Sequence, residues 1–317
     1  MTPVRLALPL AARTSIALAT RSATASSGQP VFFSSSGACS NVGATFTMTG
    51  GIGTCTVMAN QSGNANYLAA PTVTQTVTAN PASQTISFTQ SAPAQAPYNS
   101  TFTVAATASS GQLVSFTSSG VCSNVDATFM MTSGIGTCTV IANQSGNANY
   151  LAAPAVTETT AADKPAQTVT FTGAPATAPY QSTFTVTATT NSGITPIITA
   201  TGSCSISGTA VSMTRGTGQC TMTAKWAGNS NYLATTVTQT TTAEKLASTV
   251  SWTAPAAITY GIALSGTQLN ATASVAGNFV YSPAAGAIPK AGSDTLKVTF
   301  TPTLSKDYTT VTASVVL

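Results

Sequence analysis

Apolar and polar residues alternate along most of this chain, in short runs separated by glycine, proline and serine. Ile86 and Phe88 alternate with hydroxyl side chains, and Phe102, Val104 and Ala106 alternate with small polar residues further on. Runs with a period of two, rich in β-branched and aromatic residues, are typical of strands that bury one face. The pattern therefore predicts an all-β chain in which short antiparallel strands follow one another closely.

The alternating runs recur as a tandem repeat. Segment 134–150, Gly-Ile-Gly-Thr-Cys-Thr-Val-Ile-Ala-Asn-Gln-Ser-Gly-Asn-Ala-Asn-Tyr, returns almost unchanged at 51–67 and more loosely at 216–232. The tyrosines that end the three segments lie 83 and 82 residues apart. This period exceeds the roughly 20–50 residues of solenoid and propeller units and suits a small domain with its own core. The second copy has about six or seven predicted strands, which is the count of an immunoglobulin-like sandwich.

We place the four units at 1–79, 80–163, 164–244 and 245–317, and their short linkers favour a semi-extended, beads-on-a-string array over a compact cluster. The first unit matches the second only from Ala23 onwards. We therefore expect a truncated first unit that lacks two strands, with 1–22 poorly ordered, and a natural start before Met1. The fourth unit is divergent and contains no cysteine.

Composition argues against several classes of function. Charged residues make up 5% of the chain, and the net charge of +4 comes from ten scattered bases and six acids. No basic stripe follows from this distribution, so we expect no nucleic-acid partner. Histidine is absent and the six acids never lie closer than five positions apart, so we expect no catalytic centre, metal or cofactor. No apolar run is long enough for a membrane-spanning helix.

The six cysteines form three pairs with a constant spacing of 16 residues: Cys39 and Cys55, Cys122 and Cys138, Cys204 and Cys220. Pairing within each unit is the most economical of the 15 connectivities that six cysteines allow. Each bridge would stabilise its unit by about 3 kcal/mol in the chain-entropy model. Zinc binding is the alternative, but two thiols without histidine fall short of four ligands. Disulfides imply an oxidising compartment, and hence an exported protein.

Two residues of the third unit are candidate ligand contacts. Trp226 takes the place that Gln144 has in the second unit, and Lys225 precedes it. A partly exposed indole ring at this position would form a platform for carbohydrate, whereas packing against the neighbouring unit is the alternative.

Two further patterns have a functional and a structural interpretation. Tyr67, Tyr150 and Tyr232 could stack on sugars, but a tyrosine after a tight turn more often packs over strand ends. The threonine rows at 72–78 and 235–242 raise ice binding, but threonine is also the ordinary outward residue of an uncharged strand. We favour the structural interpretation of both patterns.

The run Thr-Cys-Thr-Val-x-Ala-Asn-Gln-x-Gly-Asn-x-Asn-Tyr-x-Ala-Ala resembles the end of bacterial immunoglobulin-like repeats of large secreted and surface proteins. The fourth unit is similar to another such repeat type through residues 256–261, 268–273, 279–283 and 298–302. The resemblance implies an extracellular or cell-surface segment of a bacterial protein that acts as a stalk, spacer or weak multivalent adhesive array. Its expected partners are cell-surface glycans, other surface proteins and neighbouring repeats. Carbohydrate-binding accessory modules of a larger secreted enzyme are the alternative.

Overall fold

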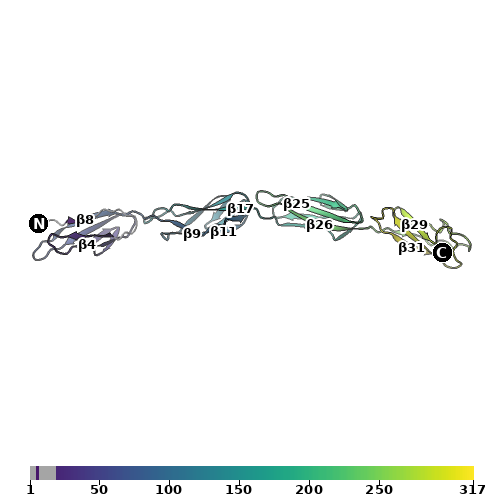
Figure 1. Cartoon of the computed structure of the whole chain (residues 1–317), viewed down its shortest axis with the longest axis horizontal. Helices are drawn as coiled ribbons and strands as arrows, with labels where there is room; N and C mark the ends of the chain where they lie inside the picture. Colours follow the sequence, from purple (N-terminus) through teal and green to yellow (C-terminus); the bar gives the residue numbers. More distant parts are fainter. Residues whose placement is uncertain (1–4, 7–18) are drawn as a thin grey trace. The chain divides into compact units, whose positions relative to one another are not determined.

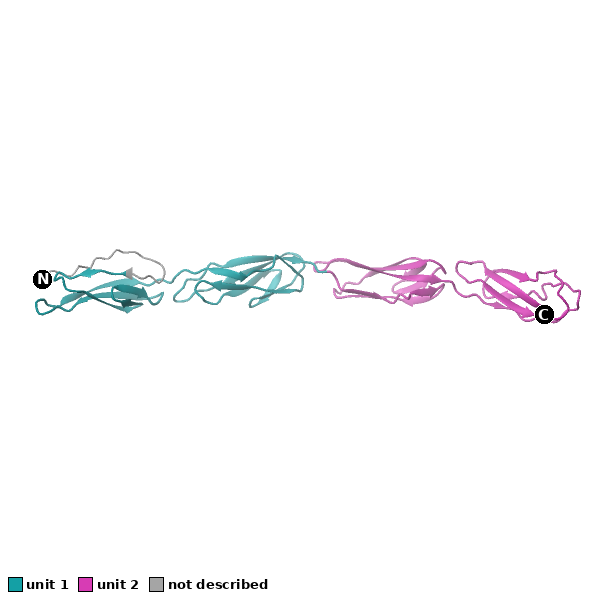
Figure 2. Ribbon diagram, turned by 60° about the horizontal axis from the view of Figure 1, so that its bottom comes forward, with its two compact units in different colours: residues 1–165 teal, residues 166–317 magenta. Residues whose placement is uncertain are grey.

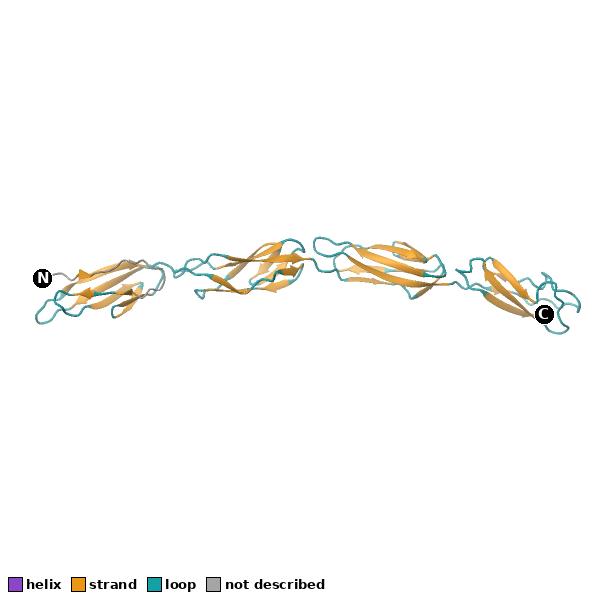
Figure 3. Ribbon diagram, in the orientation of Figure 1, coloured by secondary structure: helices purple, strands orange, loops and turns teal. Residues whose placement is uncertain are grey.

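The chain is all-β throughout the part that the structure, a computed structural model, describes: residues 5–6 and 19–317 (Figure 3). It divides into two compact units, residues 1–165 and 166–317 (Figure 2). Two sequence repeats fall in each unit, and we describe the units separately. None of the described residues belongs to a helix that could cross a membrane.

The second and third repeats have the same sheet topology. Each contains a four-stranded, a three-stranded and a two-stranded sheet. The strand orders are β10-β17-β16-β13, β11-β15-β14 and β12-β9 in the second repeat, and β19-β26-β25-β22, β20-β24-β23 and β18-β21 in the third. Figure 1 labels β9, β11 and β17 of the second repeat and β25 and β26 of the third. The strands of the second repeat are β9 (Ile86–Gln90), β10 (Gln95–Pro97), β11 (Thr101–Thr103), β12 (Ala105–Ala108), β13 (Ser115–Gly120), β14 (Cys122–Val125), β15 (Thr128–Met131), β16 (Thr137–Asn143) and β17 (Val156–Asp163). Those of the third are β18 (Val169–Thr172), β19 (Thr177–Pro179), β20 (Thr183–Thr185), β21 (Thr187–Thr190), β22 (Ile197–Gly202), β23 (Cys204–Ser207), β24 (Ala210–Met213), β25 (Gln219–Trp226) and β26 (Thr235–Glu244).

The core of each sandwich lies between the two larger sheets, where the alternating residues meet. In β16, Cys138, Val140 and Ala142 are fully buried, while the residues between them are exposed or half-buried. They belong to the face that meets Phe129 and Met131 of β15 in the opposite sheet, and these two side chains are also buried. The period-two pattern of the sequence thus places one face of each strand in the core.

The first repeat contains short forms of the two strands that we expected it to lack. Its strands are β1 (Arg5–Leu6), β2 (Ala19–Thr20), β3 (Ala23–Thr24), β4 (Phe32–Gly37), β5 (Cys39–Val42), β6 (Thr45–Met48), β7 (Thr54–Gln61) and β8 (Ala70–Thr78). Ala19 of β2 pairs with Phe46 of β6, as Phe102 pairs with Phe129 in the second repeat. The expectation that the first repeat lacks both strands is therefore wrong, because ladder hydrogen bonds need only main-chain groups and not side-chain alternation. Residues 1–4 and 7–18, where we expected poor order, lie outside the described residues.

The fourth repeat is smaller and has fewer strands. It consists of β27 (Val250–Ser251) paired with β28 (Thr272–Ala273), and of a sheet with the order β29-β30-β31, formed by β29 (Gly277–Ser282), β30 (Thr295–Pro302) and β31 (Val311–Val316). Leu264, Leu269 and Leu296 form its core cluster. The indole Nε1 of Trp252 donates to the carbonyl of Gln268 at 3.0 Å. The leucines supply the core contacts that the cysteine pair supplies in the other repeats.

Candidate functional site

Three disulfides join the two main sheets of the first three repeats. They connect β5 to β7 through Cys39–Cys55, β14 to β16 through Cys122–Cys138, and β23 to β25 through Cys204–Cys220, each with a Cα–Cα distance of 5.2 Å. The pairing predicted from the sequence is confirmed, and no cysteine is left free. Because every bridge crosses the core, it holds the two sheets of its sandwich together.

A tight turn just before each repeated tyrosine presents one amide or acid side chain. In the second repeat, Asn147 Oδ1 accepts hydrogen bonds from the main-chain nitrogens of Asn149 at 2.8 Å and Tyr150 at 3.0 Å. Asparagine favours such turns because its side chain mimics a main-chain acceptor. The turn leaves the side chain of Asn149 free to reach another part of the chain.

Within unit 1, this turn contacts the first repeat. Asn149 Oδ1 accepts a hydrogen bond from the main-chain nitrogen of Gly51 at 2.9 Å. The linker residue Ala82 pairs with the same turn, because its nitrogen donates to Asn149 O and its carbonyl accepts from Leu151 N, both at 2.8 Å. We call these contacts between a turn, a linker residue and the glycine of the preceding repeat a joint. The two repeats of unit 1 are therefore connected by more than the covalent chain.

Within unit 2, the same joint connects the third and fourth repeats. Asp307 Oδ1 accepts from the main-chain nitrogen of Gly216 at 2.7 Å. The linker residue Leu246 donates from its nitrogen to Asp307 O at 2.9 Å and accepts from Thr309 N at 3.0 Å. An acid here replaces the amide of the first joint, and a charged acceptor strengthens the hydrogen bond.

Both joints require glycine at the contact point. A Cβ atom on Gly51 would lie 2.6 Å from the Cα of Asn149, and one on Gly216 would lie 2.6 Å from the Cα of Asp307. Neither glycine has a positive φ. The requirement therefore comes from the close approach of the next repeat and not from the local turn.

A buried polar residue anchors the beginning of each later repeat against its own turn. Gln84 donates from Nε2 to the carbonyl of Leu151 at 2.7 Å, and Gln167 does the same to Leu233 at 2.8 Å. In the fourth repeat the shorter Ser248 donates to the carbonyl of Thr309 at 2.6 Å. All three side chains are buried, so each hydrogen bond satisfies a polar group that would lower the stability of the fold if it had no partner. The anchors Gln84 and Ser248 fix the turns that carry the two joints.

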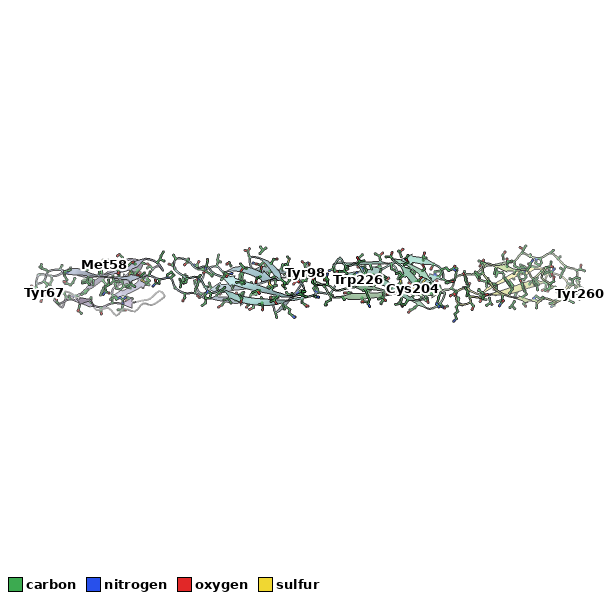
Figure 4. The ribbon with its side chains drawn as sticks, turned by 90° about the horizontal axis from the view of Figure 1, so that it is seen from above. Met58, Tyr67, Tyr98, Cys204, Trp226 and Tyr260 are labelled. Atoms are coloured by element: carbon green, nitrogen blue, oxygen red, sulfur yellow. A yellow bond between two sulfur atoms is a disulfide. The ribbon has the colours of Figure 1, made fainter. Side chains whose placement is uncertain are left out.

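The structure separates the two candidate ligand contacts of the third repeat. Trp226, labelled in Figure 4, is 1% exposed and belongs to the core of its own sandwich. Lys225 is exposed. The partial exposure considered for Trp226 is thus absent, because it lies six positions after Cys220 on the same inward face of β25. A buried indole offers no platform to a sugar. Counting the alternation through β25 would have shown this from the sequence.

The repeated tyrosines differ in their surroundings. Tyr67 is 51% exposed at the end of the first repeat (Figure 4), and Tyr150 is half-buried beside the linker residue Ala82. In unit 2, the ring of Tyr308 packs edge-on against Tyr180 of the third repeat, with ring centroids 5.4 Å apart. The tyrosine of the turn therefore contributes an aromatic contact to the joint of unit 2.

The two threonine rows lie along single strands, and Thr241 in the second row is buried. The threonine rows belong to β8 and β26, which pair with β7 and β25. No cluster of three potential metal ligands occurs in the part of the chain that the structure describes.

The joint residues were not identified from the sequence. The sequence places the repeated tyrosines after tight turns, but it does not show that such a turn contacts another repeat. One signal was present, because Gly51 recurs at the same place in three repeats without any need for a positive φ. A contact with a second backbone is the usual reason for such a glycine.

Comparison with known proteins identifies no family. No protein-family model matches the chain, and no curated protein matches it. Among solved structures, the chain is similar to Sidekick-1 immunoglobulin domains 1–5, with 9% identity, a TM-score of 0.31, and coverage of 77% of this chain and 59% of that one. It is also similar to domains 4–9 of surface layer protein SbsC, with 15% identity, a TM-score of 0.20, and coverage of 95% and 61%. The third similar structure is the Bacteroides ovatus protein SGBP-B of a mixed-linkage glucan utilization locus, in complex with a mixed-linkage heptasaccharide. The identity is 14%, the TM-score is 0.18, and the match covers 94% of this chain and 82% of that one. The chain thus spans less than two thirds of the first two structures.

Proposed function

We propose that this chain is a non-enzymatic stalk or spacer segment of an exported protein, placed outside the cell or on its surface and, by its resemblance, bacterial. Its working parts are four immunoglobulin-like domains at 1–79, 80–163, 164–244 and 245–317. The single observation that carries the proposal is the joint, which recurs in both units with the same set of contacts. A chain that repeats both a domain and its connection is suited to holding other parts at a set distance.

The joint contacts restrict bending within each unit. A rotation about the linker would separate Gly51 from Asn149 and break their hydrogen bond, while the two main-chain bonds of Ala82 hold the end of the linker against the turn. Net contributions of about 1 kcal/mol per hydrogen bond give the joint a preferred geometry without making it unbreakable. Such a connection is stiffer than a flexible linker of the same length.

The disulfides support the assignment to an oxidising compartment. Three bridges within 317 residues are typical of exported proteins and rare in reducing compartments. Neighbouring repeats of the same chain are the first partners in this proposal, and cell-surface glycans or other surface proteins are the external ones. Repetition would multiply weak contacts to such partners through effective concentration.

Distance measurements between spin labels test the stiffness of the joint in unit 1. Because all cysteines are bonded, the labels are attached through non-natural amino acids at Val42 and Val125, which are 87% and 78% exposed. We expect a narrow distance distribution in the full chain that broadens in Asn149→Ala. The matched control is Asn66→Ala, which changes the same turn position of the first repeat and should leave the width unaltered. A wild-type distribution as broad as that of a glycine-serine linker would rule out the spacer.

The second candidate function is a carbohydrate-binding accessory array. Trp226 gives it no support, because the ring is buried. The hollow lined by Phe32 and Asn60 in the first repeat favours sugar binding instead.

A further inference from the structure

A hollow of roughly 400 Å³ lies at one end of the sheet β4-β7-β8 in the first repeat, where β4 and β8 begin and β7 ends. The described residues that line it are Phe32, Asn60, Gln61, Ser62, Ala69, Ala70 and Thr72. Its size falls within the range of small-molecule sites, which combine an apolar surface with a few convergent polar groups. None of the lining residues that the structure describes is charged, so the hollow suits a neutral ligand better than an ionic one.

Phe32 supplies an exposed aromatic surface at this hollow. The side chain is 66% exposed, although phenylalanine is a residue that is usually buried. Phe32 lies directly opposite Asn60 on the neighbouring strand β7. An aromatic ring held on a rigid sheet beside an amide can stack against an apolar face while the amide binds polar groups of the same ligand.

The polar groups of the hollow are held in place by the sheet. Asn60 Oδ1 accepts from Thr72 Oγ1 at 2.8 Å, which joins β7 to β8. Gln61 is buried, and its Oε1 accepts from the main-chain nitrogen of Gly63 at 3.0 Å. Its Nε2 forms no hydrogen bond within the part of the chain that is described. Amide donors and hydroxyl acceptors therefore border the ring of Phe32.

Comparison with the second repeat identifies the residues that distinguish this hollow. Five lining residues are identical there, at 143–145, 152 and 153, and only two positions differ. Phe32 is replaced by Ser115 and Thr72 by Ala155. In the second repeat, the conserved Gln144 also accepts a hydrogen bond from Gln84. The first repeat thus has both the aromatic ring and the extra hydroxyl on an otherwise shared framework.

We infer that the hollow around Phe32 is a binding site for a neutral saccharide. A pyranose ring has an apolar face of C–H groups that stacks on an aromatic ring, and equatorial hydroxyls that exchange hydrogen bonds with amides and hydroxyls. Asn60, Gln61 and Thr72 provide such groups at the rim of the hollow. The site lies within the first repeat and is independent of the stiffness of the joints.

A single open hollow binds weakly. Dissociation constants of about 0.1–10 mM are expected for a shallow site with one stacking residue, and each lost hydrogen bond weakens binding by roughly fivefold. Saturation-transfer difference NMR on the intact chain detects binding in this range. The probes are four neutral hexasaccharides, namely cellohexaose, maltohexaose, xylohexaose and mannohexaose, with a hexamer of galacturonic acid as the charged comparison.

We expect saturation transfer to the ring C–H protons of at least one neutral probe and little transfer to the galacturonate hexamer. Phe32→Ser should reduce the effect at least tenfold and Thr72→Ala by two- to fivefold. Both variants introduce residues that the second repeat already contains at these positions, so folding should be kept. The matched control is Ile197→Ser, at the corresponding exposed position of β22.

Three results would overturn this inference: transfer to none of the neutral probes, equal transfer in Phe32→Ser and wild type, or stronger transfer to the charged hexamer. Thermal unfolding and non-reducing mass mapping of each variant show that the fold and the bridges are intact. A failure here leaves the joint measurements unaffected, because labels at Val42 and Val125 report on a different property. The spacer and the saccharide site are therefore tested separately.

Discussion

Asp307 accepts a hydrogen bond from the main-chain nitrogen of Gly216 at 2.7 Å, across 91 positions of sequence. The fourth repeat differs from the others in core, strand number and cysteine content, yet it keeps this contact in the form that Asn149 makes with Gly51. The connection between repeats is thus retained where the repeat itself has changed. This favours a role for the connection that does not depend on the interior of each domain.

Gly51→Ala should loosen the joint of unit 1 without unfolding either repeat. The new methyl group would lie 2.6 Å from the Cα of Asn149, which forces the second repeat to move away. Spin-label distances across the joint should broaden while the thermal unfolding temperature stays within about 2 °C of the wild type. Gly266→Ala is the control, because a Cβ at that position meets no atom within 4 Å. An unchanged distance distribution in Gly51→Ala would contradict the close approach.

Asp307→Asn should keep the joint of unit 2, and Asp307→Ala should lose it. Asparagine makes the same bond in unit 1, so the neutral amide preserves the geometry and gives up only the contribution of the charge. Alanine removes the acceptor, so the main-chain nitrogen of Gly216 would donate to water instead. Distance distributions with labels on the third and fourth repeats should show a small change for asparagine and a clear broadening for alanine. Equal broadening in both variants would show that the charge, and not the geometry, holds this joint.

Reduction should destabilise the third repeat but not the fourth. The bridge Cys204–Cys220 closes a loop of about 15 residues and stabilises the repeat by roughly 3 kcal/mol, whereas the fourth repeat contains no cysteine. The two tryptophans of the chain report separately, with Trp226 in the third repeat and Trp252 in the fourth. In urea with a reductant, we expect the transition of Trp226, measured in Trp252→Phe, to move to lower denaturant. The transition of Trp252, measured in Trp226→Phe, should stay in place, and a parallel shift would show that the two repeats unfold together.

Trp226→Ala should lower the stability of the third repeat by about 3–5 kcal/mol, because it removes a side chain that is 1% exposed. Lys225→Ala, at the neighbouring exposed position, should change the free energy of unfolding by less than about 0.5 kcal/mol. Urea unfolding followed by far-ultraviolet circular dichroism measures both, and the fluorescence of Trp252 in the fourth repeat serves as the unaffected reference. Little loss of stability in Trp226→Ala would mean that the ring is not packed in the core.

The sequence by itself determined the all-β class, the repeat and the cysteine pairing. These features depend on residues that are close in the sequence. A strand with one buried face needs a period of two, and the constant spacing of 16 residues brings each cysteine pair to the same place in its repeat. Residues 5–6 and 19–20 were missed for the opposite reason, since their short strands are held by main-chain bonds that leave no mark on side-chain order.

Only the tertiary structure decided where successive repeats meet and where a ligand could bind. Gly51 and Asn149 lie 98 positions apart, and nothing in either local pattern shows that one reaches the other. The hollow at Phe32 likewise depends on three strands that pair side by side, which brings residues 32, 60 and 72 to one face. Contacts of this kind join residues that are far apart in the sequence. The local pattern around each residue therefore does not show which other residue it contacts in the fold.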